Sequence, residues 1–253
     1  MVNYNYLEIV DNKSFIEVYL NRPEKLNAIN EGMLNELIDA FQKALRNESV
    51  KVIVIRGKNK NFCAGGDLNE IYNFKKSKAL EFHRKMNRLV NYVLHPEKIF
   101  IAIYEGYALG AGFELSLYCD LRFASKNSKI GYPGLRYNLI GASGGSVILP
   151  RIVGRGNAMK LILFSTILDS ETAKFLGIVQ EVWDDNEVDK KIQETVSYIA
   201  SFDSKVLKYL KSSIISSLGL SELNNLLEAE ALAYADICEL SDTKERIVKF
   251  LNR

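Results

Sequence analysis

The sequence predicts an α/β fold, because segments with the pattern of strands alternate with amphipathic helices along most of the chain. Residues 6–10 and 15–20 are rich in β-branched and aromatic residues and are separated by turn-forming residues, which predicts a hairpin. The apolar residues of 30–45 recur at i, i+3 and i+4, which predicts an amphipathic helix that Asn30 can cap. Residues 52–55, Val-Ile-Val-Ile, then predict a short strand that is buried on both faces.

A second unit of the same kind follows. A polar helix is expected at 77–94 and an apolar strand at 99–104, and a glycine-rich loop then leads into a helix at 110–118 and a strand at 121–124. Two β-rich segments and one helix in each repeat are compatible with a ββα spiral and equally with a doubly wound sheet. The periodicity alone does not choose between these two arrangements.

The chain becomes mainly helical from about residue 156. We expect one strand at 178–183 and helices at 156–165, 170–176, 186–201, 204–218, 221–239 and 242–251. Gly177 stands at a C-cap position, and Asp242-Thr-Lys-Glu245 has the spacing of a capping box with Asp242 as the N-cap. The last helices carry more apolar residues, among them Leu226 and Leu232, than a small helical tail can bury by itself. They either pack onto the α/β body or form a subunit interface.

Size and composition exclude several classes of protein. A chain of 253 residues can form one large domain or two small ones, and it can bury a core without disulfides or structural metals. Its 33 basic and 31 acidic residues argue against a strongly basic nucleic-acid-binding protein. Cys63, Cys119 and Cys238 lie far apart and form no CxxC pair, which argues against a zinc ribbon and favours a reducing compartment.

Membrane and metal sites are not expected either. The N-terminus lacks the pattern of a signal peptide, and the longest apolar runs, such as 99–104, are far shorter than the roughly 18 residues of a membrane span. The only histidines, His83 and His95, have no second histidine at metal-ligand spacing, and an HExxH motif is absent. We therefore expect a cytoplasmic protein that holds no metal and binds neither a membrane nor nucleic acid.

One short motif suggests a serine nucleophile. Gly141-Ala-Ser-Gly-Gly145 matches the G-x-S-x-G nucleophile elbow and precedes an apolar stretch that has the character of a helix. An α/β-hydrolase needs a histidine after that serine, and no histidine follows His95. We therefore interpret Ser143 as part of a tight turn leading into a helix.

Two other segments have the form of a strand followed by a loop of small residues. These are 52–68 and 99–120, and in both the small residues would let a ligand approach backbone N–H groups closely. The second loop also opens a helix, whose N-terminus favours nearby negative charge. Two such loops that face each other would donate two N–H groups to one oxygen and form an oxyanion hole. Taken singly, each glycine cluster indicates no more than a strand-to-helix turn.

Four motifs in these regions resemble those of the crotonase superfamily, the enoyl-CoA hydratase/isomerase family. Asn21-Arg-Pro-Glu-Lys-Leu-Asn-Ala-Ile29 resembles its N-terminal signature. Phe62-Cys-Ala-Gly-Gly-Asp-Leu68 and Gly106-Tyr-Ala-Leu-Gly-Ala-Gly-Phe-Glu114 resemble its first and second oxyanion-hole loops. Tyr132-Pro133, with Gly144-Gly145 and Pro150-Arg-Ile-Val-Gly154, resembles the stretch that completes the active site. The four occur in the family's order and span nearly the whole chain.

The resemblance implies an α/β fold with a crotonase-like ββα spiral core at 1–200 and a C-terminal helical region at 201–253 that builds a homotrimer or a dimer of trimers. It implies an acyl-CoA thioester substrate and no further cofactor, since coenzyme A is part of that substrate. By position, the N–H groups of Ala64 and Ala111 would bind the thioester oxygen, and Glu114 would be a catalytic acid and base. The residues that would contact coenzyme A or the acyl group are Lys25, Ala28, Ala64, Gly65, Asp67, Leu68, Tyr132 and Pro133.

The sequence departs from the family at one position. Family hydratases usually carry a second glutamate directly after the proline of the Tyr132-Pro133 stretch, where this chain has Gly134. No other acidic residue lies between Asp120 and Asp169. Because one carboxylate with an oxyanion hole suffices to move a proton between two carbons, the substitution favours double-bond isomerisation.

Other interpretations remain open at this stage. An atypical hydratase would need Tyr132, Tyr137 or Ser143 to position the water. A non-catalytic acyl-CoA-binding relative would keep the fold and the coenzyme A site without turnover. A serine hydrolase that uses Ser143 is the third alternative. Arg136 would either read an acidic acyl group or be an exposed loop cation, and we favour the latter.

Overall fold

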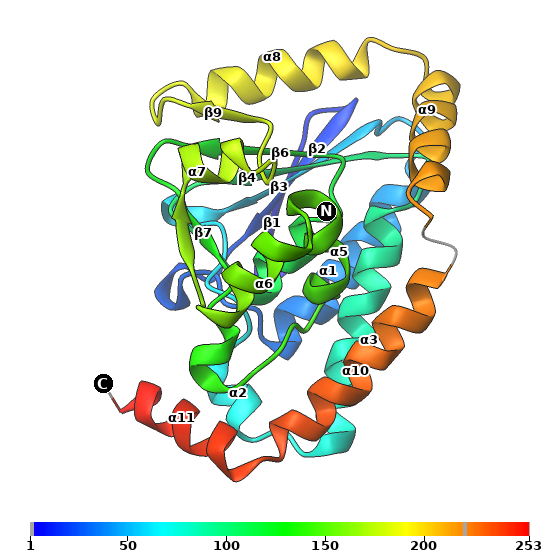
Figure 1. Cartoon of the computed structure of the whole chain (residues 1–253). Helices are drawn as coiled ribbons and strands as arrows, with labels where there is room; N and C mark the ends of the chain where they lie inside the picture. Colours follow the sequence, from blue (N-terminus) through cyan, green and yellow to red (C-terminus); the bar gives the residue numbers. More distant parts are fainter. Residues whose placement is uncertain (1–2, 220–221, 253) are drawn as a thin grey trace.

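The computed structural model describes residues 3–219 and 222–252 and has two β-sheets surrounded by helices (Figure 1). The larger sheet has the order β1-β2-β3-β4-β6-β9; β1 and β2 are antiparallel, and all later pairs are parallel. The smaller sheet has the order β5-β7-β8. The strands are β1 (Leu7–Asp11), β2 (Phe15–Leu20), β3 (Val52–Gly57), β4 (Ile99–Tyr104), β5 (Tyr107–Leu109), β6 (Leu121–Ser125), β7 (Lys129–Gly131), β8 (Ile167–Asp169) and β9 (Glu181–Trp183).

Helices connect these strands and continue to the C-terminal end of the described chain. The α-helices are α1 (Glu31–Arg46), α2 (Leu68–Tyr72), α3 (Lys76–Val93), α4 (Gly110–Ser116), α5 (Gly145–Val153), α6 (Arg155–Leu163), α7 (Ser170–Phe175), α8 (Val188–Ala200), α9 (Ser204–Ser217), α10 (Leu223–Cys238) and α11 (Ser241–Leu251). Short 3₁₀ turns lie at η1 (Pro23–Lys25), η2 (Lys58–Lys60) and η3 (Gly134–Tyr137). Figure 1 shows α10 alongside α3, with α11 turning back toward α2. Within the described residues, no helix is both long and apolar enough to cross a membrane.

The larger sheet is buried on both faces, as the apolar strand at 52–55 predicts. Ile53 and Ile55 face the main core, whereas Val52 and Val54 face a second core. That second core is closed by apolar side chains of α8 and α9, such as Val196. Because a continuous Val/Ile run leaves no polar face, both layers of helices are needed to cover the strand.

The main predictions for the first half of the chain are confirmed. The hairpin at 6–20 forms as β1 and β2, and the predicted helix at 30–45 forms as α1. Asn30 caps α1 by accepting a hydrogen bond of 2.8 Å from the backbone N–H of Met33. Gly177 follows α7 with φ +77°, a conformation that glycine adopts without strain.

Three predictions need correction. The strand expected at 178–183 begins only at Glu181, because Ile178 and Val179 belong to the turn after α7, where their N–H groups bond back to Ala173. Helix α11 begins one residue before Asp242, which caps nothing and instead pairs with Arg246 one turn later. The helix predicted from 221 begins at Leu223, and Ser221 lies outside the described residues. Helix α2 and the strands of the smaller sheet were not predicted, since each has only three to five residues.

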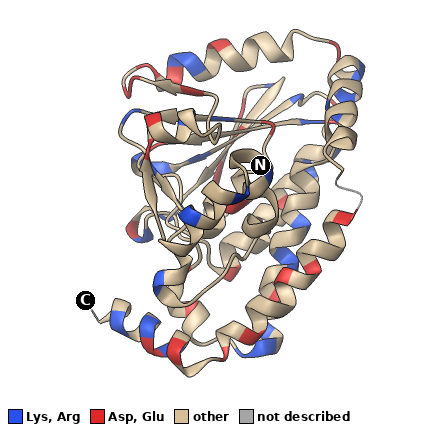
Figure 2. Cartoon of the chain, viewed as in Figure 1, with Lys and Arg blue, Asp and Glu red and all other residues tan. Residues whose placement is uncertain are grey.

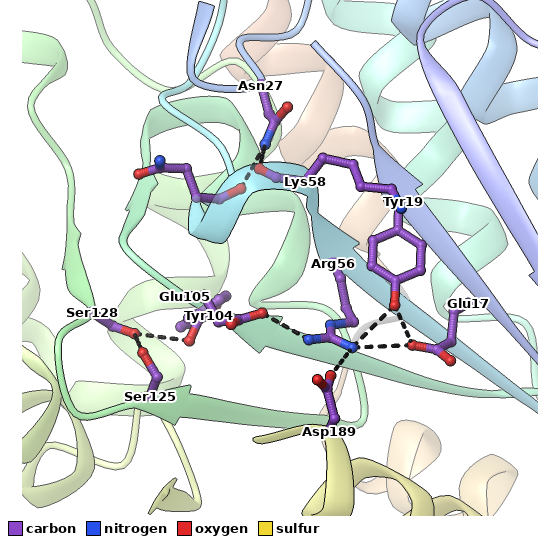
Figure 3. A network of polar contacts seen from close by, with 11 residues as sticks. Glu17, Tyr19, Asn27, Arg56, Lys58, Tyr104, Glu105, Ser125, Ser128 and Asp189 are labelled. Atoms are coloured by element: carbon purple, nitrogen blue, oxygen red, sulfur yellow. Dashed lines mark hydrogen bonds and ion pairs between the residues drawn. The ribbon is translucent and has the colours of Figure 1, made fainter. Parts of the chain in front are cut away.

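Charged side chains of both signs are distributed over the helices and loops rather than gathered in one area (Figure 2), in keeping with a net charge of +2. One of the buried charged side chains is Arg56, near the end of β3. Its guanidinium contacts the carboxylates of Glu17 at 3.3 Å, Glu105 at 2.9 Å and Asp189 at 2.7 Å (Figure 3). This network joins the neighbouring strands β2, β3 and β4 to α8, close to the ends of β3 and β4 from which the glycine-rich loops depart.

Candidate active site

A cavity of about 650 Å³ lies between the two glycine-rich loops and the C-terminal helices. Its volume is in the usual range for a small-molecule site. Nine of the residues that the resemblance marks line it directly, namely Lys25, Ala28, Ala64, Gly65, Asp67, Leu68, Ala111, Glu114 and Pro133. The four sequence motifs, which are far apart in the chain, therefore come together around one cavity.

The two loops are joined by backbone hydrogen bonds. The N–H of Cys63 donates to Tyr107, and the N–H of Leu109 donates back to Cys63, both at 2.8 Å. Beyond this bridge Gly65 (φ +108°) and Gly110 (φ +50°) approach so closely that a methyl group on Gly110 would lie 3.3 Å from the Cα of Gly65. Both positions favour glycine because of their positive φ, and at Gly110 the close contact adds to this.

The N–H groups expected to bind a thioester oxygen have different environments. Ala111 is the second residue of α4, where backbone N–H groups have no partner within the helix. Ala64 instead donates its N–H to the carbonyl of Leu26 at 2.9 Å. Leu26 itself lies in the left-handed region (φ +49°) and lines the cavity. A ligand oxygen would have to replace Leu26 as the partner of Ala64.

Glu114 lies in α4 at the inner end of the cavity and is only 3% exposed. Its Oε2 atom accepts hydrogen bonds of 2.9 Å from the backbone N–H groups of both Ala142 and Ser143, just before α5. Burial, and secondly the negative charge of Glu230, raise the pKa of Glu114 to about 8, although these N–H bonds oppose the shift. A carboxyl group with such a pKa can both accept and return a proton near neutral pH.

Sequence analysis did not single out Glu230 or Tyr234 of α10. Tyr234 lines the cavity, and Glu230, one turn before it, is buried next to Glu114. A methyl group at Gly141 would lie 2.7 Å from Oε2 of Glu114 and 2.9 Å from Oε1 of Glu230. In the sequence, Glu230 is marked only by being a glutamate on a helix face that is otherwise apolar. This pattern does not reveal which distant residue the helix packs against.

The segment from the N-terminal signature forms the outer wall of the cavity. Lys25 is exposed at its mouth in η1, whereas Ala28 is buried. Asp67, the N-cap of α2, forms an ion pair of 2.6 Å with Arg22. Although burial raises its pKa, this ion pair and the N–H of Asn69 outweigh that effect, so the pKa of Asp67 is lowered.

Asn27 fastens this segment to the first glycine-rich loop. It is fully buried, and its side-chain NH₂ donates to the carbonyls of Lys58 at 3.0 Å (Figure 3) and Asn61 at 2.6 Å. Its Oδ1 accepts from the N–H of Arg22 at 2.9 Å. One amide thereby positions the backbone on both sides of Leu26, whose carbonyl meets Ala64.

The Tyr132-Pro133-Gly134 stretch is placed differently from what its motif implies for Tyr132. Pro133 and Gly134 line the cavity, whereas Tyr132 is buried behind it, with its hydroxyl close to Gly141. A methyl group at Gly134 would lie 2.7 Å from the carbonyl oxygen of Leu139. The turn is therefore too tight for a side chain here, which gives a physical reason for the missing glutamate.

The remaining residues that the sequence raised have local roles. Ser143 is fully buried directly before the N-cap of α5, in the tight turn that was expected, and its hydroxyl donates to the carbonyl of Ala111 at 3.4 Å. Arg136 is exposed at the cavity wall and donates to the carbonyl of Ser165 at 3.0 Å. Tyr137 lines the cavity and packs against the ring of Phe250 in α11.

The chain is similar to known proteins over nearly its whole length. The sequence model of the family Enoyl-CoA hydratase/isomerase matches residues 11–253. The chain is 31% identical to Enoyl-CoA isomerase/hydratase fer4 of Mycosarcoma maydis, over 97% of this chain and 93% of that protein. It is 29% identical to Crotonyl-CoA hydratase of Syntrophomonas wolfei, over 93% and 91%. The crystal structure of enoyl-CoA hydratase from Thermoplasma volcanium is 36% identical, with a TM-score of 0.81 and 97% coverage of both chains. This chain is therefore a crotonase-fold member of the enoyl-CoA hydratase/isomerase family.

Proposed function

We propose that this enzyme shifts the double bond of an enoyl-CoA thioester, with Glu114 moving a proton between two carbons of the acyl chain. One observation carries the proposal. Three acidic residues line the cavity, and both Glu24 and Asp67 pair with Arg22 near its mouth. Glu114 alone lies at the inner end beside Ala111 and has no basic partner among the described residues. It is thus the one cavity carboxylate that is free to exchange a proton with the acyl group.

The reaction begins when Glu114 takes a proton from the carbon next to the thioester carbonyl or from its vinylogous position. The C–H electron pair moves into the conjugated system, and negative charge develops on the carbonyl oxygen. The N–H of Ala111, together with that of Ala64 once Leu26 is displaced, supplies the donors that stabilise this enolate; one such donor is typically worth about 2.7–4 kcal/mol. Glu114 then returns the proton two carbons away, so no other reactant is needed.

Hydration of a 2-enoyl-CoA is the second candidate. It is supported by the name of the Syntrophomonas wolfei relative, a crotonyl-CoA hydratase. Hydration in this family uses two carboxylates to hold and split water, and the turn at Gly134 has no room for the usual second one. This difference makes isomerisation the better supported of the two reactions.

The test compares turnover of a 3-enoyl-CoA and a 2-enoyl-CoA by the purified protein and by Glu114→Gln. A double-bond shift in the 3-enoyl ester that falls by about 10²-fold or more in the variant supports the proposal. Hydration of the 2-enoyl ester, lost in the same variant, would replace isomerisation by the second candidate. Binding of both esters without turnover would instead indicate the non-catalytic relative.

We also propose that the chain assembles as a trimer or as a dimer of trimers. Helix α9 supports this, because its apolar side chains Val206, Tyr209, Leu210 and Ile214 are more than half exposed in the single chain. Such a stripe on a helix that covers the sheet is typical of a buried interface. Light scattering should give a mass of at least three chains, and a stable monomer would contradict the proposal.

A further inference from the structure

The region behind Glu114 contains a second carboxyl group that the proposed reaction does not use. Glu230 of α10 is only 6% exposed, and it does not line the cavity. A methyl group placed on Gly141 would lie within 3 Å of Oε2 of Glu114 and also within 3 Å of Oε1 of Glu230. These two oxygens are therefore no more than about 6 Å apart. Two buried carboxyl groups at this separation interact strongly, since little water screens them.

Hydrogen bonds to the start of α5 hold both groups in place. Glu114 accepts from the N–H groups of Ala142 and Ser143, and Oε1 of Glu230 accepts from the hydroxyl of Ser146 at 2.6 Å and from its N–H at 3.3 Å. The positive end of one short helix thus stabilises negative charge on either group. It does not compensate both charges at once.

The buried titratable groups that pack against the pair carry no charge near neutral pH. From α3, His83 is fully buried with Nε2 3.7 Å from Oε2 of Glu230, and burial lowers its pKa to about 4. The surrounding phenols are those of Tyr118 beyond α4, Tyr132 before Gly134 and Tyr234 of α10; burial raises the pKa of each above its ordinary value. Glu228 on α10 is turned outward and pairs with Arg84. In the described part of the chain, no lysine or arginine forms an ion pair with Glu114 or Glu230.

We propose that Glu230 is a positioning residue of this active site, which keeps its own negative charge behind Glu114 and thereby makes Glu114 a stronger base for a carbon-bound proton. The inference rests on the proposed function, in which Glu114 must remove such a proton. At about 6 Å and an effective dielectric constant near 20, one charge changes the proton affinity of its neighbour on the order of 100-fold. Burial raises the pKa of both carboxyl groups, and the charge of Glu230 raises that of Glu114 further, so the pair binds one proton near neutral pH, mainly on Glu114. Glu114 acts as the base in those molecules in which its carboxyl group is ionised.

The different surroundings of Glu114 and Glu230 agree with these two roles. Glu114 lines the cavity and can exchange a proton with a ligand, whereas Glu230 is bound by Ser146 and does not line the cavity. Helix α10 therefore adds a carboxyl group behind Glu114, whereas a glutamate at the position of Gly134 would stand at the cavity wall. The two carboxyl groups lie 116 residues apart, as their numbers show, and meet only because α10 packs along α3.

The test is a carboxyl titration that requires no turnover. Infrared difference spectra of the full chain should show one carboxyl group that stays protonated up to about pH 8 and is absent in Glu114→Gln. In Glu230→Gln the midpoint of this titration should fall by at least one pH unit, about tenfold in proton affinity. Glu230→Asp keeps the charge and should restore part of the shift. Glu228→Gln, on the exposed side of the same helix, should leave the midpoint unchanged.

Two results would overturn the proposal. One is a titration midpoint in Glu230→Gln that equals that of the wild type. The other is a carboxyl group that still titrates near pH 8 in Glu114→Gln. Glu114→Gln provides this second test even if Glu230→Gln fails to fold. If the enzyme is active, the acidic limb of its pH profile of kcat/KM should move to lower pH in Glu230→Gln and by a smaller amount in Glu230→Asp. If the titration follows the expected pattern but the protein has no isomerase activity, the proposed function is contradicted and the proposed interaction of Glu114 with Glu230 still holds. The failure of one proposal can therefore be distinguished from the failure of the other.

Discussion

Glu114 and Ser143 lie 29 residues apart in the chain, and the carboxylate of the first accepts a hydrogen bond of 2.9 Å from the backbone N–H of the second. Ser143 is the centre of the G-x-S-x-G pattern, and its hydroxyl points to the carbonyl of Ala111 rather than to a base. The motif thus acts through its backbone: it presents two N–H groups to a carboxylate instead of presenting a nucleophile to a substrate.

Ser143→Ala should therefore keep most of the activity. The substitution retains the N–H that binds Glu114 and removes only a weak hydroxyl contact, so we expect kcat to fall by no more than about tenfold, or ~1.4 kcal/mol in activation free energy. Steady-state kinetics with the better enoyl-CoA ester measures this. An inactive variant, together with labelling of Ser143 by a serine-reactive phosphonate, would revive the serine hydrolase alternative.

Gly145→Ala should damage the site by contact with Glu114. A methyl group there would lie 2.6 Å from Cγ of Glu114 and 2.7 Å from the ring of Tyr132, so one of them must move. We expect a loss of about 1–3 kcal/mol in unfolding free energy, from overpacking, and a lower kcat. Gly156→Ala in α6 is the matched control, since its methyl group would meet open space. Denaturant unfolding of both variants checks the difference, and equal effects would show that contact with Glu114 is not the cause.

Asp67→Asn should have an effect that depends on pH. Because the pKa of Asp67 is lowered in the folded state, its charge stabilises the protein fully above about pH 4, the ordinary value for aspartate, and this contribution is lost as the pH falls through the lower folded value. At neutral pH we expect the variant to lose about 1–3 kcal/mol, because the ion pair with the partly buried Arg22 is removed.

The loss in Asp67→Asn should shrink in unfolding experiments carried out below about pH 4. Asp242→Asn breaks an exposed pair with Arg246 and should change stability by less than about 1 kcal/mol at any pH. A loss at Asp67 that stays constant into the acid range would show that its charge is not responsible.

Asn27→Ala should weaken both the fold and the binding of the ligand. The variant leaves the partly buried carbonyls of Lys58 and Asn61 without their donor, which costs about 2–4 kcal/mol, and it frees the segment that carries Leu26. We expect KM for the enoyl-CoA ester to rise more than kcat falls, because this segment lines the cavity without touching Glu114.

Asn59→Ala is the control for the strain of the backbone. Asn59 (φ +53°) has nearly the same left-handed conformation as Asn27 (φ +57°), but its side chain is exposed. Alanine in the left-handed region should lower the free energy of unfolding equally in both variants. The difference between their losses of stability therefore measures the contribution of the side-chain hydrogen bonds of Asn27. Equal losses of stability would refute the anchoring role of Asn27.

Much of the fold follows from local patterns. Hydrophobic periodicity and helix capping depend on residues only a few positions apart in the chain. Neighbouring residues therefore predict the hairpin, the cap of α1 at Asn30 and the strand that begins at Val52. The glycine-rich loops and Glu114 were recognisable for a similar reason, since each motif is continuous. Short elements such as α2 and β8 escaped prediction, because three to five residues carry too little periodicity.

The proton chemistry of the site, by contrast, depends on contacts between distant segments. Burial and the charge of a neighbour set the strength of Glu114 as a base, and that neighbour, Glu230, belongs to a helix whose amphipathic pattern alone does not reveal its packing partner. The tight turn at Ser143 was predicted from the sequence, but the partner of its backbone N–H, Glu114, is set by the tertiary structure. Sequence patterns identify the residues that can react and the elements that carry them, and only the packing of α4, α5 and α10 around Gly141 determines their charge, because electrostatic interactions act through space and not along the chain.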